Sequence, residues 1–375
     1  MATNEQDTNH LRSERLDAAF RRFRDHPVVA QFRSFLAESP DRALFHIDVD
    51  ALARDWGVER RTVLELFLRS VHFGILSMEW AFHCPTCGGV AQESLNLAHT
   101  HEQDFCPVCR VDFQNTLDDN VEVFFSVSPE IRPLPEELKK EYVDGVMQDI
   151  SATGRHDWKS GATIRGVEVL NHPVFRDLFG EDTLSLDQSL EISSATILFT
   201  DVTGSTAMYE ALGDARAYRL IRDHFDVVFD AIVAQEGVPI KTIGDAVMGV
   251  FTNEVAAVRA AFQMHDALEA SNASREDGQD LSLKIGVHRG PVIVVTLNNR
   301  IDYFGRTVNI ASRVQSISGA RELSMLRDTL AAPGVRETLK ERVSTVRRNR
   351  KTLKGIAGTA EVYRISLEAS PYPAS

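Results

Sequence analysis

Carboxylate, amide and guanidinium side chains recur in short, turn-containing stretches in the second half of the sequence. Asp201 ends an apolar run, and Asp245 follows a glycine in the stretch 240–246. Asn309 and Arg313 lie four positions apart. Carboxylates suit Mg²⁺ or Mn²⁺ as oxygen ligands, and a guanidinium can bind a phosphate through two parallel hydrogen bonds. Together these groups could hold metal ions against a phosphate and stabilise the charge that develops as it reacts.

The expected strands would bring the two carboxylates together. Residues 195–200 have the pattern of a strand that ends at Asp201, and 239–243 and 246–251 predict two strands around the turn that holds Asp245. Pairing of these central strands would place both carboxylates at one end of a sheet. The alternative is that Asp201 caps the helix that follows it and that Asp245 only suits its turn.

A helix expected over 307–318 carries the amide and the guanidinium. Residues four apart lie one above the other on a helix, so Asn309 and Arg313 share a face. The alternative role of these two side chains is local, in a capped or salt-bridged amphipathic helix.

The loop after Asp201 predicts an anion site. Thr203, Gly204 and Ser205 lead into a helix expected over 205–236. The N–H groups at a helix N-terminus attract negative charge, and a glycine lets a ligand approach the backbone closely. We therefore assign this loop to the phosphates of a substrate.

The remaining pattern predicts the fold of this half. A second helix is expected over 254–270, followed by a strand pair over 281–288 and 292–296. A tight turn is expected at 298–299, where two asparagines tolerate left-handed backbone. The order strand, helix, two strands, helix, strand is the split βαβ pattern of ferredoxin-like α+β folds.

In their order and spacing these stretches resemble the class III adenylate and guanylate cyclases over residues 189–366. The resemblance implies that Asp201 and Asp245 hold two Mg²⁺ or Mn²⁺ ions in each active site. It also implies that Asn309 orients the ribose and that Arg313 meets the charge on the α-phosphate. The implied reaction converts ATP into 3′,5′-cyclic AMP and pyrophosphate.

The resemblance also assigns the base and the terminal phosphates. Lys241 and Asp302 match positions that read the base, where a lysine donates to a purine ring nitrogen and an aspartate accepts from the adenine amino group. Guanylate cyclases usually have Glu and Cys or similar residues there, so the pair implies ATP, with GTP as the alternative. Without a base-reading role, they would be a surface lysine and a salt-bridged aspartate. Lys354 resembles the lysine near the end of the family's domain that binds the terminal phosphates. Residues 295–300 differ from the family, because many relatives have a glycine-rich hairpin at this position.

Each active site in this family is shared between two protomers. One protomer brings the metal-binding aspartates, and the other brings the base-reading and transition-state residues. A single chain here holds the whole set, so the resemblance implies a homodimer with two equivalent sites around a two-fold axis.

The four cysteines form two Cys-x-x-Cys pairs in the first half of the chain, Cys84 with Cys87 and Cys106 with Cys109. In a reducing compartment this spacing predicts a tetrahedral zinc site with ligands from two tight turns. Two disulfides are the alternative, but nothing in the sequence marks export. We therefore expect a structural Zn²⁺ in this half.

The first half also has helical patterns over 11–38, 47–58 and 60–73 and strand patterns over 76–82 and 121–127. The second and third helices look like a winged helix-turn-helix, fused here to a zinc ribbon. A similar domain of unestablished function precedes some bacterial cyclases. We expect a regulatory module that binds a protein or a ligand. The alternative is a DNA-binding or nucleotide-sensing regulator whose cyclase-like half only dimerises.

The composition narrows the class of partners. The 375 residues include 41 basic and 54 acidic side chains, which gives a formal net charge of −13. An acidic chain gains no general attraction to nucleic acid or to an anionic membrane. The sequence contains no apolar run of about 18 residues and no signal-peptide core, so we expect a cytoplasmic protein.

These patterns together predict five segments. They are a disordered tail over 1–10, a helix-turn-helix plus zinc ribbon over 11–132, a connector over 133–188, the cyclase domain over 189–368 and a tail over 369–375.

Overall fold

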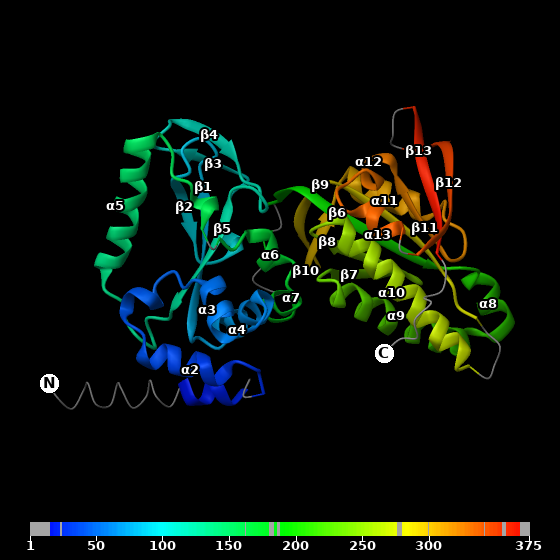
Figure 1. The fold of residues 1–375 in the computed structure, drawn as a ribbon, viewed down its shortest axis with the longest axis horizontal. Helices are drawn as coiled ribbons and strands as arrows, with labels where there is room; N and C mark the ends of the chain where they lie inside the picture. Colours follow the sequence, from blue (N-terminus) through cyan, green and yellow to red (C-terminus); the bar gives the residue numbers. More distant parts are fainter. Residues whose placement is uncertain are drawn as a thin grey trace. The chain divides into compact units, whose positions relative to one another are not determined.

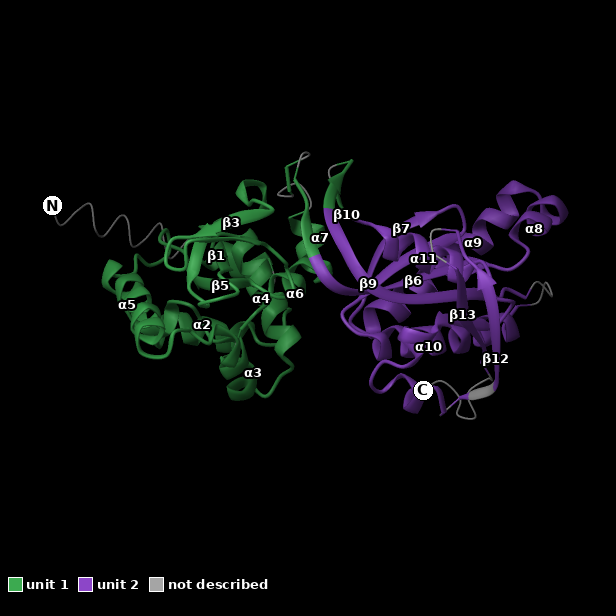
Figure 2. Cartoon of the chain, turned by 90° about the horizontal axis from the view of Figure 1, so that it is seen from above, with its two compact units in different colours: residues 1–191, 295–301 green, residues 192–294, 302–375 purple. Residues whose placement is uncertain are grey.

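The protein was examined as a computed structural model, which describes residues 16–22, 25–161, 163–179, 184–185, 188–275, 280–298, 300–340, 342–354 and 358–367. The chain divides into two compact units (Figure 2). Unit 1 contains residues 1–191 and 295–301, and unit 2 contains residues 192–294 and 302–375. The expected tails at 1–10 and 369–375 lie outside the described residues.

Unit 1 combines helices with a three-stranded antiparallel sheet of order β2-β1-β5. Its strands are β1 (Leu76–His83), β2 (Val90–Ser94), β3 (Gln103–Cys106), β4 (Val111–Gln114) and β5 (Val121–Val127). Its helices are α2 (Val29–Glu38), α3 (Val49–Trp56), α4 (Arg60–His72), α5 (Glu136–Thr153), α6 (Gly166–Leu170) and α7 (Pro173–Leu178), with short 3₁₀ turns η1 (Asp41–Leu44), η2 (Leu97–His99) and η3 (Trp158–Ser160).

Local sequence signals account for the helix pair α3 and α4. Asp48 caps α3 by accepting a hydrogen bond from the Ala51 N–H at 2.7 Å. Gly57 ends α3 with a left-handed φ of 67°, the usual role of glycine after a helix. The buried face of α4 includes Phe67, whose ring lies 5.4 Å from that of Phe125 on β5. Two helices joined by a turn lie at the expected positions; their assignment as a winged helix-turn-helix stays a prediction, and DNA binding through them stays the alternative.

The segment 133–188 differs from the expected connector, because it folds as part of unit 1. Trp158 is buried and stacks on His83 at a centroid distance of 4.2 Å. Phe175 is buried at 6.0 Å from Trp80. The apolar residues of this segment are spaced irregularly among glycines and prolines, so no period in the sequence marked them as core.

Unit 2 is built on an eight-stranded sheet of order β12-β13-β11-β9-β6-β8-β7, with β10 paired to β9. The strands are β6 (Leu190–Val202), β7 (Val238–Ile243), β8 (Ala246–Phe251), β9 (Leu283–Leu297), β10 (Arg300–Phe304), β11 (Glu322–Leu326), β12 (Val343–Thr352) and β13 (Thr359–Leu367). The helices are α8 (Ser205–Leu212), α9 (Asp214–Ala234), α10 (Glu254–Ala273), α11 (Arg306–Gln315), α12 (Arg327–Leu330) and α13 (Val335–Lys340).

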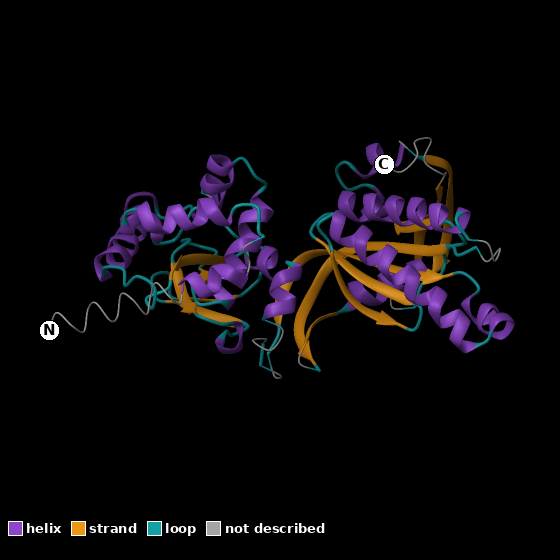
Figure 3. Ribbon diagram, turned by 90° about the horizontal axis from the view of Figure 1, so that it is seen from below, coloured by secondary structure: helices purple, strands orange, loops and turns teal. Residues whose placement is uncertain are grey.

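The centre of unit 2 has the expected α+β pattern. Within the sheet, β9-β6-β8-β7 is the strand order that a split βαβ unit produces from strand, helix, two strands, helix, strand. The long helices α9 and α10 run beside each other over this sheet (Figures 1 and 3). Buried residues from helices and strands, among them Ile232, Val258 and Ile285, form one apolar cluster. The cluster fixes the strands that carry the candidate site.

Two expected elements differ in the structure. The helix expected over 205–236 is divided into α8 and α9 at Gly213, which has a φ of 74°. The strands expected over 281–288 and 292–296 form one strand, β9, which pairs with β10 through a turn at Asn298 with a φ of 51°. Pro291 lies between the two expected strands, and a proline can lie within a strand where no ladder hydrogen bond is needed from its nitrogen.

No helix in the described part of the chain is both long and apolar enough to cross a membrane.

Candidate active site and metal centre

The two carboxylates assigned to metal binding lie at neighbouring positions of the unit 2 sheet. Strands β6 and β8 are antiparallel, with Thr200 opposite Val247. Asp201 follows Thr200 on β6, and Asp245 occupies the turn between β7 and β8. The Val202 N–H donates to Asp245 Oδ2 at 3.2 Å, which holds the second carboxylate against the strand end that carries the first.

The Asp201 carboxylate is already paired with a lysine side chain. The ammonium of Lys284, on β9, is 3.1 Å from Asp201 Oδ2. Because β9 and β6 are neighbours in the sheet, this lysine reaches the carboxylate from the adjacent strand. The contact indicates that Asp201 is arranged to accept positive charge, and two carboxylates close together are the oxygen ligands that Mg²⁺ or Mn²⁺ requires. The residues present therefore fit a divalent cation.

Lys284 and His224 are residues that the sequence did not single out. His224 is buried on α9, and burial lowers its pKa while nearby Asp245 acts in the opposite direction. Neither residue belongs to a recognisable motif. Their proximity to the carboxylates depends on strand order and helix packing, which no local sequence signal records.

The loop after Asp201 is only partly available for an anion. The Thr203 N–H donates to the Ser282 carbonyl at 2.8 Å, so it is already used within the protein. Gly204 adopts a left-handed φ of 73° before α8, which begins at Ser205. The N–H groups that can meet a phosphate are therefore those from Gly204 onward, at the N-terminus of α8.

Lys241 and Asp302 contact each other although they are far apart in the sequence. Lys241 Nζ lies 2.5 Å from Asp302 Oδ2, and it also lies 5.2 Å from the centre of the Phe304 ring. Asp302 is buried and accepts a second hydrogen bond, from the Tyr303 N–H at 2.8 Å. The pair is thus a donor and an acceptor held side by side.

Asn309 and Arg313 lie on α11, as the spacing predicted. Asn309 is exposed, and its Nδ2 donates to the Gly305 carbonyl at 3.3 Å. The opposite face of α11 packs through Ile310 and Val314 against the sheet. One helix face is therefore fixed by the core, and the other can present both side chains to a ligand.

Lys354 lies apart from these contacts, in the turn that follows β12, where it is exposed.

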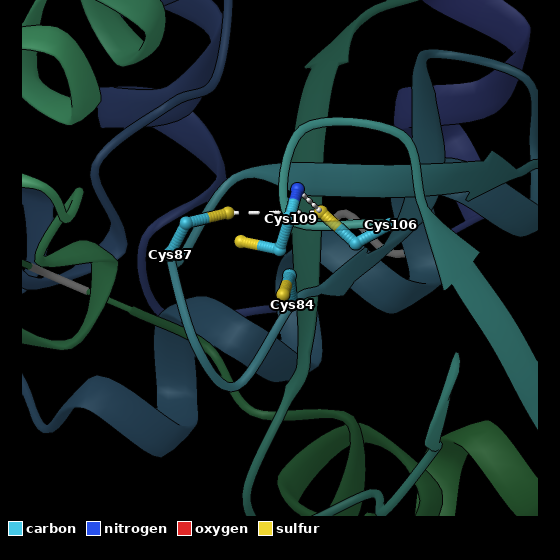
Figure 4. A group of neighbouring side chains, drawn as sticks. All are labelled: Cys84, Cys87, Cys106 and Cys109. Carbon is cyan, nitrogen blue, oxygen red and sulfur yellow. Dashed lines mark hydrogen bonds between the residues drawn. The ribbon is translucent and has the colours of Figure 1, made fainter. Parts of the chain in front are cut away.

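The four cysteines of unit 1 converge, with their sulfur atoms all within 4.8 Å of one another (Figure 4). All four are free thiols rather than disulfides. Cys87 Sγ lies 3.7 Å from Cys106 Sγ, close to the separation of about 3.8 Å expected between sulfurs on a tetrahedral zinc with Zn–S bonds of about 2.3 Å. The Cys109 N–H donates to Cys106 Sγ at 3.4 Å. The donor set fits a structural Zn²⁺.

Comparison with known proteins identifies both parts of the chain. Residues 188–367 match the adenylate and guanylate cyclase catalytic domain, and residues 11–241 match a family of unknown function, DUF5939. An adenylate cyclase from Anabaena cylindrica is 34% identical over 148 residues, which are 35% of this chain and 30% of that protein. The receptor-type guanylate cyclase gcy-8 from Caenorhabditis elegans is 32% identical over 139 residues, which are 34% of this chain and 12% of that protein.

The chain therefore spans less than a third of the length of these curated relatives. Among solved structures, the adenylyl cyclase CyaB from P. aeruginosa is 22% identical, with a TM-score of 0.41, and the match covers 50% of this chain and 100% of that one. The chain belongs to the DUF5939 family of unknown function, and its second half is a class III adenylate and guanylate cyclase catalytic domain.

Proposed function

We propose that this protein is an adenylate cyclase that converts ATP into 3′,5′-cyclic AMP and pyrophosphate in a homodimer. The observation that carries the proposal is the arrangement of Asp201 and Asp245, which lie together at the end of β6 within the cyclase domain.

The proposed reaction forms a bond between the ribose 3′-oxygen and the α-phosphorus and breaks the bond to the β-phosphate, so that pyrophosphate leaves. Divalent ions bound at the aspartates would make the 3′-hydroxyl more acidic and screen the triphosphate. Lys284 can turn from Asp201 towards the phosphates once a metal ion replaces it. The N–H groups at the start of α8 would hold the phosphate oxygens.

The residues of α11 would act on the reacting groups. Arg313 would neutralise charge that develops on the α-phosphate, a role in which an arginine contributes about 10³–10⁵ in rate in related phosphoryl transfers. Asn309 would hold the ribose so that its 3′-oxygen lies in line with the leaving group. Lys241 and Asp302 would select adenine, since their contact already places a donor beside an acceptor.

A product assay tests the proposal. The full chain is incubated with ATP and Mg²⁺ or Mn²⁺, and cyclic AMP and pyrophosphate are quantified by chromatography. We expect Asp201→Asn and Arg313→Ala each to lower the rate by at least about 10²-fold. Asp230→Asn, an exposed change on α9, serves as the matched control and should leave the rate unchanged. Equal product from all four proteins would reject the proposed activity.

GTP is the second candidate substrate, because a receptor-type guanylate cyclase is among the relatives of this domain. The same assay with GTP alone, and with both nucleotides in competition, separates the two. A larger kcat/KM for GTP would replace the adenylate assignment without affecting the proposed roles of the aspartates.

We further propose that the four cysteines hold one structural Zn²⁺ in each chain, supported by their convergence to within 4.8 Å. Elemental analysis of the purified protein should find about one zinc per chain. Cys84→Ser should lose the metal and lower the melting temperature of unit 1, while Thr86→Ser, between the first two ligands, should change neither. Full stability without bound zinc would contradict the assignment.

A further inference from the structure

Unit 1 contains a cleft of about 370 Å³ that the proposed cyclase chemistry does not use. Its walls come from β5, from α5, from the turn before α3 and from residues 156–164. This volume lies within the range of sites that bind small molecules. The lining combines aromatic rings with acidic side chains, and the combination points to a particular class of ligand.

The rings of Phe124, Tyr142 and Trp158 and the imidazole of His46 line the cleft. The His46 ring stacks between Phe45 and Phe124, at centroid distances of 3.9 and 3.8 Å. Tyr142 meets His46 edge-on at 4.8 Å and Phe124 at 5.7 Å. Because His46 covers one face of Phe124, a cation would be attracted to the opposite face of that ring or to the ring of Tyr142.

The conformation of His46 is unusual and is fixed by its neighbours. Its backbone has a left-handed φ of 46°, a conformation that residues with a side chain rarely adopt. The ring stack and the hydrogen bond from its N–H to Ser126 Oγ, at 3.1 Å, hold it in place. Burial lowers the pKa of His46 to about 3, so its ring is neutral at physiological pH and adds no positive charge to the wall.

The charged groups that line the cleft are acidic. They are Asp48, Glu122 and Asp157, and no lysine or arginine lines the cleft among the residues that the structure describes. His156 also lines the cleft, and its Nδ1 lies 2.8 Å from Asp149 Oδ2, outside the cleft. Asp48 uses Oδ1 to cap α3, and Glu122 uses Oε2 to accept from His83. A carboxylate has a second oxygen, which can accept further hydrogen bonds.

The cations near the cleft are paired with carboxylates that do not line it. Lys139 lies 2.5 Å from Glu93, and Lys159 lies 2.5 Å from Asp119. Arg60 pairs with Glu168. These partners are not cleft residues, so the acids of the cleft keep their negative charge for a ligand.

We propose that this cleft binds a small organic cation of the alkylammonium class, held by the rings of Phe124 and Tyr142 and by the carboxylates of Asp48, Glu122 and Asp157. The aromatic wall receives the apolar part of the ligand together with its positive charge. The carboxylates accept from donors on the ligand and favour a cation over an anion of the same size. The domain of unknown function thus carries a ligand site of its own.

Calorimetric titration of the full chain tests the proposal without any nucleotide. The probes are choline and 3,3-dimethylbutan-1-ol, which has the same shape without the charge. We expect saturable binding of choline and at least about tenfold weaker binding of the neutral alcohol, since a desolvated cation–π contact contributes roughly this much. Putrescine, a dication, and arginine, which carries a guanidinium, an ammonium and a carboxylate, are titrated in parallel as cations on other carbon frames.

Charge-removing variants locate the binding in the cleft. Asp48→Asn keeps an oxygen to cap α3 but removes a charge, and Asp157→Asn removes the other exposed charge. The double variant should bind the cation about tenfold more weakly, while Asp55→Asn, an exposed change on α3, should bind it as the parent does. Melting temperatures establish that each variant is folded.

Two results would overturn the inference. One is equal affinity for choline and the neutral alcohol, which would make the cleft a general apolar site. The other is the absence of binding by all three cations up to about 10 mM in a folded protein. Phe124→Leu provides an independent variant, because it keeps the volume largely apolar and removes a ring, and it should weaken cation binding if the wall acts as proposed.

Discussion

Two carboxylates of the candidate site are each paired with a lysine, Asp201 with Lys284 and Asp302 with Lys241. The Asp201–Lys284 pair is partly exposed, and such ion pairs contribute only about 0–1 kcal/mol to stability, so a metal ion can displace Lys284 at little cost. Asp302 is buried, so its pair with Lys241 holds the two side chains in fixed positions. They also keep donors and acceptors at the positions where a substrate would need them.

Substrate choice should depend on the second of these pairs. In Lys241→Glu/Asp302→Cys, a donor that favours adenine is replaced by an acceptor, and the acceptor for the adenine amino group is lost. We expect the ratio of kcat/KM for ATP to that for GTP to fall by about 10²-fold, because a mismatched polar group in a binding site costs a few kcal/mol. Steady-state kinetics with both nucleotides measures this ratio. Lys340→Gln, on α13, lowers the net charge by one unit, as the double variant does, and is the control for that change. An unchanged ratio in the double variant would remove the pair from base selection.

The sequence allowed the charged groups to be predicted but not their neighbours. Asp201, Asp245, Asn309 and Arg313 were chosen by their match to the motifs of the cyclase family, and their expected positions at a strand end, in a turn and on one helix face agree with that choice. Lys284 could not be predicted, because its contact with Asp201 depends on β9 lying next to β6. Strand order arises from packing of the whole sheet, and one strand's sequence does not contain it.

At the level of elements, the position of α11 depends on one glycine. A Cβ added at Gly286 on β9 would lie 2.3 Å from the backbone nitrogen of Gln315 and 2.4 Å from its Cα. Backbone atoms cannot move aside as the end of a flexible side chain can. The absence of a side chain at Gly286 therefore lets the C-terminal end of α11 lie directly on the sheet, which sets where Asn309 and Arg313 point.

Gly286→Ala should displace α11 and reduce cyclase activity strongly. A shift of about 1 Å in catalytic groups can cost about 10²-fold in rate, so we expect a loss of that order, with a lower melting temperature for unit 2. Gly145→Ala is the matched control, because Gly145 lies within α5 and an added Cβ would meet nothing within 4 Å. That change should leave activity intact and raise helix stability by roughly 0.5–1 kcal/mol. Activity of Gly286→Ala equal to the parent would mean that α11 tolerates displacement.

The bounds of the predicted elements were most accurate where a short run of residues is enough to define a strand. The strands β5 and β8 have the expected bounds, because each is a short apolar run between polar or turn residues. The division of the helix at Gly213 and the folding of 133–188 into unit 1 were missed. A glycine within a helical pattern does not by itself end a helix, and irregularly spaced apolar residues become core only through contacts distant in the sequence.

At the scale of the whole molecule, the proposed site needs two chains. Asp201 and Asp245 belong to β6 and the β7–β8 turn, whereas Asn309 and Arg313 belong to α11. By the family resemblance, the first pair of one protomer meets the second pair of its partner. A two-fold axis then creates two identical sites, and each chain contributes to both.

Mixing two inactive variants tests this arrangement directly. Asp201→Asn and Arg313→Ala should each be inactive as homodimers, since every site lacks one group. In a mixed dimer, one site has both substitutions and the other has neither. Random exchange of equal amounts makes about half of the dimers mixed, with one intact site of two, so the mixture should recover about a quarter of the parent activity.

The measurement is cyclic nucleotide production after the two variants are co-expressed with different affinity tags, and tandem purification raises the expected recovery to about half of the parent value. Mixing Asp201→Asn with Asp245→Asn is the control. Both changes then affect the same half of the site, so each mixed dimer has two damaged sites and no activity should return. Recovery in this control, or none in the test pair when mixed dimers are present, would mean that the sites are not divided between chains as proposed. The comparison therefore separates a shared site from one completed within a single chain. Only when the sites are shared does a mixed dimer carry both substitutions in one active site and leave the other active site intact.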